Sequence, residues 1–146
     1  MSYWDTSALV KLYAPEPDSA LFANHALARA LPLRICRLGL YEARATFQRK
    51  EAEGLLRAGA AELLHAQILA DVAAGDVLLT ELDENLERQY AAILHECYQR
   101  TPPLPIRTLD AIHLAAARLT GATEVVATDK RVREVARFIG LSLFPA

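Results

Sequence analysis

Four acidic residues fall where the elements of a parallel sheet would bring them together. Asp5 closes the first expected strand and Asp129 closes the fourth, while Glu42 and Asp110 each lie near the first turn of a helix. Ligands of open parallel sheets gather at the carboxyl ends of the strands. Right-handed crossovers return every strand in the same direction, so we expect all four carboxylates at one edge of the sheet.

Carboxylates that converge at one edge repel one another strongly. A pair about 4 Å apart costs roughly 4 kcal/mol at an effective dielectric constant near 20. Either protons or a divalent cation must relieve this repulsion. Mg²⁺ and Mn²⁺ prefer hard oxygen ligands and accept sites with few carboxylates plus water, so the four acids are candidate ligands for either ion.

Each acid also has a purely structural interpretation. Asp5 and Asp129 precede helices and could be N-caps, which is a common role for aspartate. Asp110 could be a first-turn carboxylate favoured by the helix dipole. Glu42 has Arg44 close by in sequence and could be a solvated surface acid. Only the four positions taken together favour a functional site.

The elements that must position these acids alternate between short apolar runs and helical patterns. We expect strands at about 2–5, 33–36, 76–80, 124–128 and 141–144, and helices at about 6–14, 18–30, 39–54, 57–74, 85–100, 108–119 and 130–139. Thr108 is the expected cap of its helix. Strands that alternate with helices predict parallel βαβ units, and hence an α/β fold: an α/β/α sandwich around a mainly parallel sheet.

Composition and charge exclude several classes of protein. Of the 146 residues, 53% are hydrophobic and 23% are charged, and the net charge is −2. This balance excludes binding of nucleic acid by bulk charge, although not a local basic rim around an acidic site. Two distant cysteines, Cys36 and Cys97, offer no metal knuckle or disulfide framework and fit a reducing compartment. With no apolar run of 18 residues and no signal peptide, we expect a cytoplasmic protein without a membrane span.

Three segments and one further acid resemble a known family. They are residues 5–13 (DTSALVKLY), 109–115 (LDAIHLA) and 129–131 (DKR), with Glu42 in a helix between the first two. The segments resemble the PIN domain and, more narrowly, the VapC-type ribonuclease toxins of bacterial and archaeal toxin–antitoxin pairs. The resemblance runs along the whole chain and implies that residues 1–146 form a single PIN-like nuclease domain.

The resemblance implies a metal-dependent endoribonuclease that cleaves RNA phosphodiester bonds. Asp5, Glu42, Asp110 and Asp129 match the family's acidic quartet, which holds Mg²⁺ or Mn²⁺. Such an ion lowers the pKa of a bound water and offsets charge on the leaving oxygen. The resemblance also implies a homodimer and a cognate antitoxin protein that holds the toxin inactive.

Three residues with hydroxyl groups are candidates to support the acids. Thr6 and Ser7 adjoin Asp5 and could orient its carboxylate or a metal-bound water, with helix capping as the alternative. Family members often carry Ser or Thr shortly before the glutamate and two residues before the fourth acid. This chain departs from both patterns and offers only Thr128 near the fourth acid. The sequence therefore leaves the support of these two acids open.

Basic side chains and a histidine lie beside the third and fourth acids. Arg107, Lys130 and Arg131 are candidates to contact RNA phosphates, with ordinary surface charge as the alternative. His113 follows Asp110 by three residues and could act as a general base or a metal ligand. A packed histidine bonded to a neighbour is the more economical interpretation, because metal-activated water needs no side-chain base.

Two other classes of function compete with a nuclease. A PIN-fold module that binds RNA or protein without cutting would use its acids as caps, but it has no need to maintain so much repulsion. An aspartyl-phosphate enzyme would use Asp5 as its nucleophile and needs a second acid two residues later, where this chain has Ser7. An aspartyl-phosphate enzyme also leaves the segment 109–115 unexplained.

Overall fold

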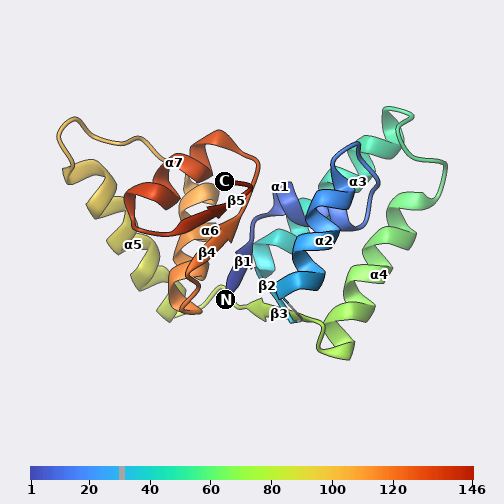
Figure 1. Ribbon diagram of the computed structural model, residues 1–146, viewed down its shortest axis with the longest axis horizontal. Coiled ribbons are helices and arrows are strands. Elements are labelled where there is room, and N and C mark those ends of the chain that lie inside the picture. The colour runs from blue at the N-terminus through green and yellow to red at the C-terminus, as the bar shows by residue number, and fades with distance from the viewer. Residues whose placement is uncertain (30–31) are drawn as a thin grey trace.

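Within residues 1–29 and 32–146, which the computed structural model describes, the fold is built on a five-stranded sheet (Figure 1). Its strands are β1 (Ser2–Trp4), β2 (Leu33–Cys36), β3 (Val77–Thr80), β4 (Glu124–Val126) and β5 (Ser142–Phe144). They lie in the order β3-β2-β1-β4-β5, and every neighbouring pair is parallel. The expected parallel sheet is confirmed.

Helices cover both faces of this sheet (Figure 1). One face carries α1 (Thr6–Leu9), the short 3₁₀ helix η1 (Val10–Leu12), α2 (Ser19–Arg29), α3 (Arg37–Ala52) and α4 (Ala60–Ala74). The other face carries α5 (Glu84–Gln99), α6 (Thr108–Leu119) and α7 (Lys130–Phe138). This arrangement is the expected α/β/α sandwich. Among the described residues, none of the helices has the length and apolar character needed to cross a bilayer.

Two hydrophobic cores follow from the alternation of side chains along the strands. Successive residues of a strand point to opposite faces of the sheet. Tyr3 and Val125 therefore pack in the core beneath α5, α6 and α7, whereas Trp4 and Val126 pack in the core beneath α1 to α4. Both cores hold β1 firmly, so the residue that follows it has a fixed place at the edge of the sheet.

Several expected element boundaries are wrong, including those of the helix expected over 39–54, which is α3 (Arg37–Ala52), and the strand expected over 124–128, which ends at Val126. The helix expected over 6–14 divides into α1 and η1, and its last turn tightens to a 3₁₀ helix that ends at Leu12. The helix expected from 57 begins at Ala60, after Gly59 takes a left-handed conformation with φ 84°. Thr108 is the first helical residue, and the cap position is held by Arg107. The expected end near residue 30 lies outside the described residues.

Glu124, at the start of β4, is a buried acid at the amino edge of the sheet. Its carboxylate accepts a hydrogen bond from Ser2 Oγ at 2.5 Å and lies 2.9 Å from His25 Nε2 and 3.2 Å from Arg29 Nη2. Burial by itself would raise the pKa of Glu124, but these three partners outweigh burial and lower it. The ionised carboxylate is therefore part of the folded structure.

We expect Glu124→Gln to destabilise the protein in a pH-dependent way. Because the folded-state pKa is lowered, the carboxylate contributes stability above the usual glutamate range, and this contribution is lost as the pH falls through the folded-state value. The variant should unfold more easily at neutral pH by about 1–3 kcal/mol. Urea denaturation across a pH series measures the difference, which should shrink in acid. A difference that stays constant with pH would contradict a charge-based contribution.

Candidate active site

The order of the strands places a topological switch point between β1 and β4, and the space at the carboxyl edge of these two strands is termed the crevice. The chain leaves β1 to build β2 and β3 on one side, and later returns as β4 on the other side. Open parallel sheets bind ligands at such switch points. Asp5 directly follows β1, and Asp129 comes three residues after the end of β4, so these two acids flank the crevice.

Asp5 is buried, and Ser7 links its carboxylate to the segment that follows β4. It is the N-cap of α1, and its Oδ2 accepts hydrogen bonds from the backbone N–H of Ser7 at 3.1 Å and from Ser7 Oγ at 2.6 Å. Ser7 Oγ in turn accepts a hydrogen bond from the backbone N–H of Thr128 at 3.0 Å. The capping interpretation of Asp5 thus holds, and the same contacts fix its carboxylate at the crevice.

We expect Ser7→Ala to disturb this connection between the ends of β1 and β4. The change removes a donor to Asp5 and leaves the N–H of Thr128 without its partner. Loss of a group that orients a metal-ligating carboxylate typically weakens metal binding by about 10–100-fold. Calorimetric titration with Mn²⁺ measures the change, and Ser142→Ala at the opposite edge is the matched control. Equal affinities in the two variants would contradict a role for Ser7.

Glu42 lies on α3 and points to Asp5's side of the crevice. Its Oε1 accepts a hydrogen bond from Thr6 Oγ1 at 2.8 Å and contacts Nε2 of His113. Burial raises the pKa of Glu42, but the hydrogen bond and charge of His113 and the bond from Thr6 outweigh it and lower the pKa. The alternative of a solvated surface acid does not describe a carboxylate with two such partners.

Asp110 and Asp129 form a second pair, joined by an arginine. Asp110 lies in the first turn of α6 and is buried. Arg107 Nε donates to its Oδ2 at 2.7 Å and Nη2 donates to its Oδ1 at 3.1 Å, while Nη2 also lies 3.5 Å from Oδ2 of Asp129. Asp129 caps α7 by accepting from the N–H of Arg131 at 2.9 Å and of Val132 at 3.3 Å.

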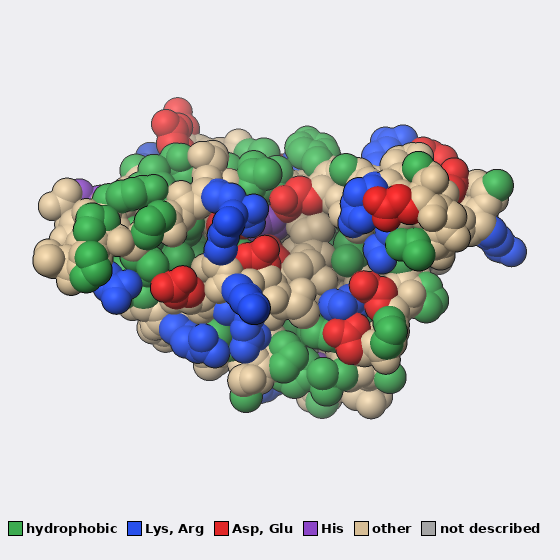
Figure 2. All heavy atoms as spheres, turned by 90° about the horizontal axis from the view of Figure 1, so that it is seen from above, with side chains coloured by type: hydrophobic (Ala, Val, Ile, Leu, Met, Phe, Trp, Pro, Cys, Tyr) green, Lys and Arg blue, Asp and Glu red, His purple; other side chains and the backbone are tan. Residues whose placement is uncertain are grey.

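The two pairs of acids share one face of the molecule. Viewed from above, acidic side chains lie near its middle with Lys and Arg side chains between and around them (Figure 2). A cavity of about 200 Å³ there is lined by Glu42, Arg107 and Asp110, among others. Oδ1 of Asp5 lies 3.7 Å from Nε2 of His113, the group that also contacts Glu42. His113 therefore lies between the carboxylates of Asp5 and Glu42, as Arg107 lies between those of Asp110 and Asp129.

The supporting hydroxyls are distributed differently from their order in the sequence. Thr6 adjoins Asp5 in the chain, yet its hydroxyl donates to Glu42. Thr128 contributes its backbone N–H, which bonds to Ser7, rather than its hydroxyl. The sequence therefore placed the right residues near the crevice but did not specify which acid each one serves.

The candidate RNA contacts also divide into two kinds. Arg107 is engaged with Asp110 and Asp129, although its side chain is 54% exposed. Lys130 and Arg131 are exposed at the start of α7, and neither side chain forms an ion pair with any residue that the structure describes. Only these last two are free to meet a ligand without first leaving a partner.

His113 is a part of the site that the sequence interpretation left aside. Its side chain is buried, and it bonds to Tyr3 and Glu42, so the expectation of a packed histidine bonded to a neighbour is confirmed. The sequence did not indicate that the neighbour is one of the four acids. The spacing of three residues from Asp110 was the available signal, because positions i and i+3 share one side of a helix.

The chemistry of the four acids fits a hard divalent cation. They offer only carboxylate oxygens, which are the ligands that Mg²⁺ and Mn²⁺ prefer. In the described part of the chain no three Asp, Glu, His or Cys side chains are arranged to hold a metal ion, and Arg107 is bonded to both Asp110 and Asp129. That arginine is long and half-exposed, so it can leave both carboxylates without disturbing the core.

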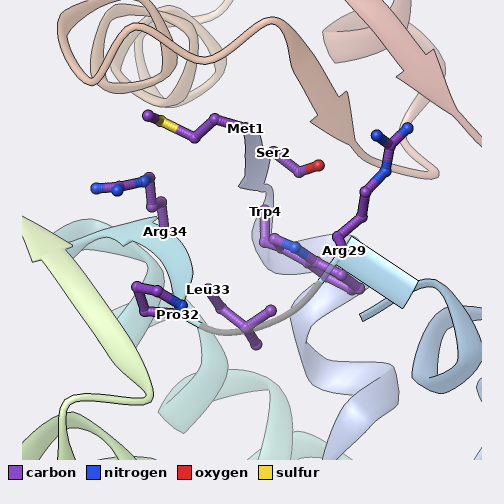
Figure 3. A pocket seen from close by; sticks show the side chains of 7 residues that line it. All are labelled: Met1, Ser2, Trp4, Arg29, Pro32, Leu33 and Arg34. Carbon is purple, nitrogen blue, oxygen red and sulfur yellow. The ribbon is translucent and has the colours of Figure 1, made fainter. Parts of the chain in front are cut away.

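A second hollow lies at the opposite edge of the sheet (Figure 3). It has a volume of about 310 Å³ and lies between the amino ends of β1 and β2, with Trp4, Arg29, Leu33 and Arg34 in its wall. The described residues that line it include no carboxylate. It therefore offers none of the ligands that a hard metal ion requires, and the candidate site remains at the carboxyl edge.

Comparisons with known proteins agree with this geometry. The sequence matches the family model of the PIN domain over residues 2–138. It is 31% identical over 146 residues to Ribonuclease VapC46 of Mycobacterium tuberculosis. This alignment covers 97% of this chain and 94% of that protein. Both matches extend through the segments that contain the four acids.

Solved structures share the same architecture at lower sequence identity. VapC20 of Mycobacterium tuberculosis, described as a sarcin–ricin loop cleaving toxin, has a TM-score of 0.65 and 20% identity and covers 92% of this chain and 94% of its own. A toxin–antitoxin complex from Klebsiella pneumoniae has a TM-score of 0.59 and 14% identity over 88% of this chain and 87% of its own. With a family model that matches nearly all its length and a relative of full length, the chain belongs to the PIN domain family, among the VapC-type ribonucleases.

Proposed function

We propose that this protein is a metal-dependent endoribonuclease that cleaves RNA phosphodiester bonds and serves as the toxin of a toxin–antitoxin pair. One observation carries the proposal. Asp5 and Asp129 flank the crevice between β1 and β4, and the contacts of Glu42 and Asp110 bring both to the same edge. Membership of the VapC-type ribonucleases supports RNA as the substrate class.

The four acids have distinct roles in this proposal. Asp5, Glu42 and Asp110 are the residues that would hold Mg²⁺ or Mn²⁺, and Asp129 completes the acidic wall and orients the attacking water. When bound, the ion lowers the pKa of water and stabilises charge on the scissile phosphate and leaving oxygen. Arg107 would have to release Asp110 for that carboxylate to hold the ion, and its guanidinium would then be free to bind an RNA phosphate.

The protein partners are proposed from the same family membership. The fold is shared with a solved toxin–antitoxin complex, which supports a cognate antitoxin protein as the partner that holds the nuclease inactive in the cytoplasm. The active form is proposed to be a homodimer. Light scattering on the purified chain checks this, because a dimer must have twice the mass that the sequence gives.

Cleavage of a labelled mixed RNA pool tests the proposed activity. The purified protein is incubated with Mn²⁺, with Mg²⁺ or with EDTA, and the products are resolved by length. We expect discrete fragments with either metal and intact RNA with EDTA. Cleavage that continues in EDTA, or a folded, antitoxin-free protein that cuts no RNA under any condition, would contradict a metal-dependent endoribonuclease.

Lys130 and Arg131 are proposed to contact the RNA backbone beside Asp129. Replacing both with Ala should weaken binding of RNA and lower the dependence of log affinity on log salt by about 1 per removed contact. Fluorescence anisotropy with a short RNA at several salt concentrations measures this slope in the presence of Mg²⁺. Arg88→Ala on α5 is the matched control. An unchanged slope would place the RNA on another surface.

A further inference from the structure

A chain of buried side chains runs from the core beneath α6 to the crevice. Tyr3 lies on β1, His113 lies on α6, and both side chains are almost entirely buried. The hydroxyl of Tyr3 is 2.8 Å from Nδ1 of His113, and Nε2 of the same ring contacts Oε1 of Glu42. Three elements that are distant in the sequence thus meet in one hydrogen-bonded line that ends at an acid of the candidate site.

The chemistry of the partners fixes the proton that faces Glu42. An ionised carboxylate only accepts hydrogen bonds, so Nε2 must carry the proton that points to Glu42. In a neutral ring Nδ1 accepts from the hydroxyl of Tyr3, and in a protonated ring Nδ1 donates to the same hydroxyl, so Nε2–H faces Glu42 in both cases. Burial raises the pKa of Tyr3 well above its ordinary value, so this hydroxyl keeps its proton. In either state every member of the line has a hydrogen-bond partner, and Nε2 donates to Glu42.

Two donors hold one carboxylate oxygen of Glu42 in place. Helix α3 passes the ring at Gly39, where a Cβ atom would lie 3.5 Å from Thr6 Oγ1 and 3.9 Å from Cε1 of His113. Thr6 Oγ1 also donates to Oε1 of Glu42, so that oxygen has two fixed donors. The other oxygen, Oε2, has no hydrogen-bond partner among the described residues and is left for a ligand.

We propose that His113 is a positioning residue of the nuclease: held by Tyr3, it donates its Nε2 proton to Glu42 and thereby fixes that carboxylate beside Asp5 for metal binding. The inference rests on the proposed function, because it concerns the same acids. Both ring nitrogens are engaged and the side chain is 2% exposed, so His113 neither ligates the metal nor accepts a proton from water. It acts on the reaction only through Glu42.

Two substitutions at position 113 distinguish a hydrogen-bond donor from a side chain that only packs in the core. His113→Leu fills much of the volume but offers no donor, whereas His113→Gln places an amide N–H near the former Nε2. We expect Mn²⁺ affinity, measured by electron paramagnetic resonance, to fall by about 10–100-fold in the Leu variant. The Gln variant should recover most of this loss. His95→Leu on the surface of α5 is the matched control and should bind Mn²⁺ like the wild type.

Tyr3→Phe tests the far end of the line with a smaller change. It removes only the hydroxyl, so the ring of His113 loses the partner that fixes its orientation, and Mn²⁺ affinity should fall by less than in the Leu variant. This variant and His113→Gln keep the inference testable if His113→Leu does not fold. Folding of each variant is checked by circular dichroism and thermal melting before metal is added.

A metal-free measurement distinguishes failure of this inference from failure of the proposed function. In protein labelled with ¹⁵N-histidine, long-range ¹H–¹⁵N spectra should show a protonated Nε2 for His113, absent in His113→Gln and shifted in Glu42→Gln. Three results would each overturn the inference. They are a folded His113→Leu variant with wild-type Mn²⁺ affinity, a His113→Gln variant that binds Mn²⁺ no better than His113→Leu, and a His113 signal that is the same in Glu42→Gln as in the wild type. Wild-type protein that binds no Mn²⁺ would instead contradict the proposed metal site, and with it the role assigned to His113 there.

Discussion

Asp110→Asn is expected to lower RNA cleavage by on the order of a thousandfold, more than the change typical for a residue that only orients a ligand. The amide has the shape of the carboxylate but no charge, so it is a poor ligand for a hard cation. Stability should change little, because Arg107, the partner that is lost, is half-exposed and can turn to solvent. Initial rates of cleavage with saturating Mn²⁺, beside a melting curve for each protein, measure both effects.

Asp5→Asn should give a similar loss for a related reason. The amide oxygen of Asn can still accept the N–H of Ser7, so the start of α1 is preserved while the charge at the crevice disappears. Glu62→Gln, a change of an exposed acid on α4, is the control and should leave cleavage unaltered. Activity that persists in both aspartate variants would show either a contaminating nuclease or a site elsewhere on the molecule.

Phe47→Ala is expected to lower the free energy of unfolding by about 3–5 kcal/mol, the cost typical of a large core side chain. Phe47 is fully buried on α3 and belongs to the core beneath α1 to α4, together with Trp4 and Ile68. A loss of this size is a large part of the stability of an ordinary domain. Because α3 also carries Glu42, a cavity at this position should loosen the site as well as the core.

Phe138→Ala provides the matched control for this prediction. Phe138 ends α7 with 41% of its surface exposed, and its ring lies 5.4 Å from the guanidinium carbon of Arg100. Its removal should cost no more than about 1 kcal/mol. Urea denaturation, with the slope compared between variants, measures both changes. If the two variants lose the same stability, the core assigned to Phe47 is wrong.

Local pattern was enough to predict the α/β/α sandwich and the edge of the sheet to which the acids belong. Apolar strands that alternate with helices must run parallel, and parallel strands present their carboxyl ends together, so Asp5 and Asp129 had to fall at the same edge. Local pattern was less reliable where backbone geometry intervenes. The left-handed Gly59 delays the start of α4, although this residue is plain in the sequence.

The sequence by itself determined which acids, hydroxyls and basic groups reach the crevice, because the order of strands and helices carries them there. Only the tertiary structure decided how they pair. Glu42 meets His113 across 71 residues of chain, and Thr6 serves Glu42 rather than its sequence neighbour Asp5. Such contacts depend on the ångström-scale packing of α3 against α1 and α6, which periodicity does not encode. Arg107 likewise reaches Asp129 only because β4 returns beside β1 and places α7 next to the start of α6.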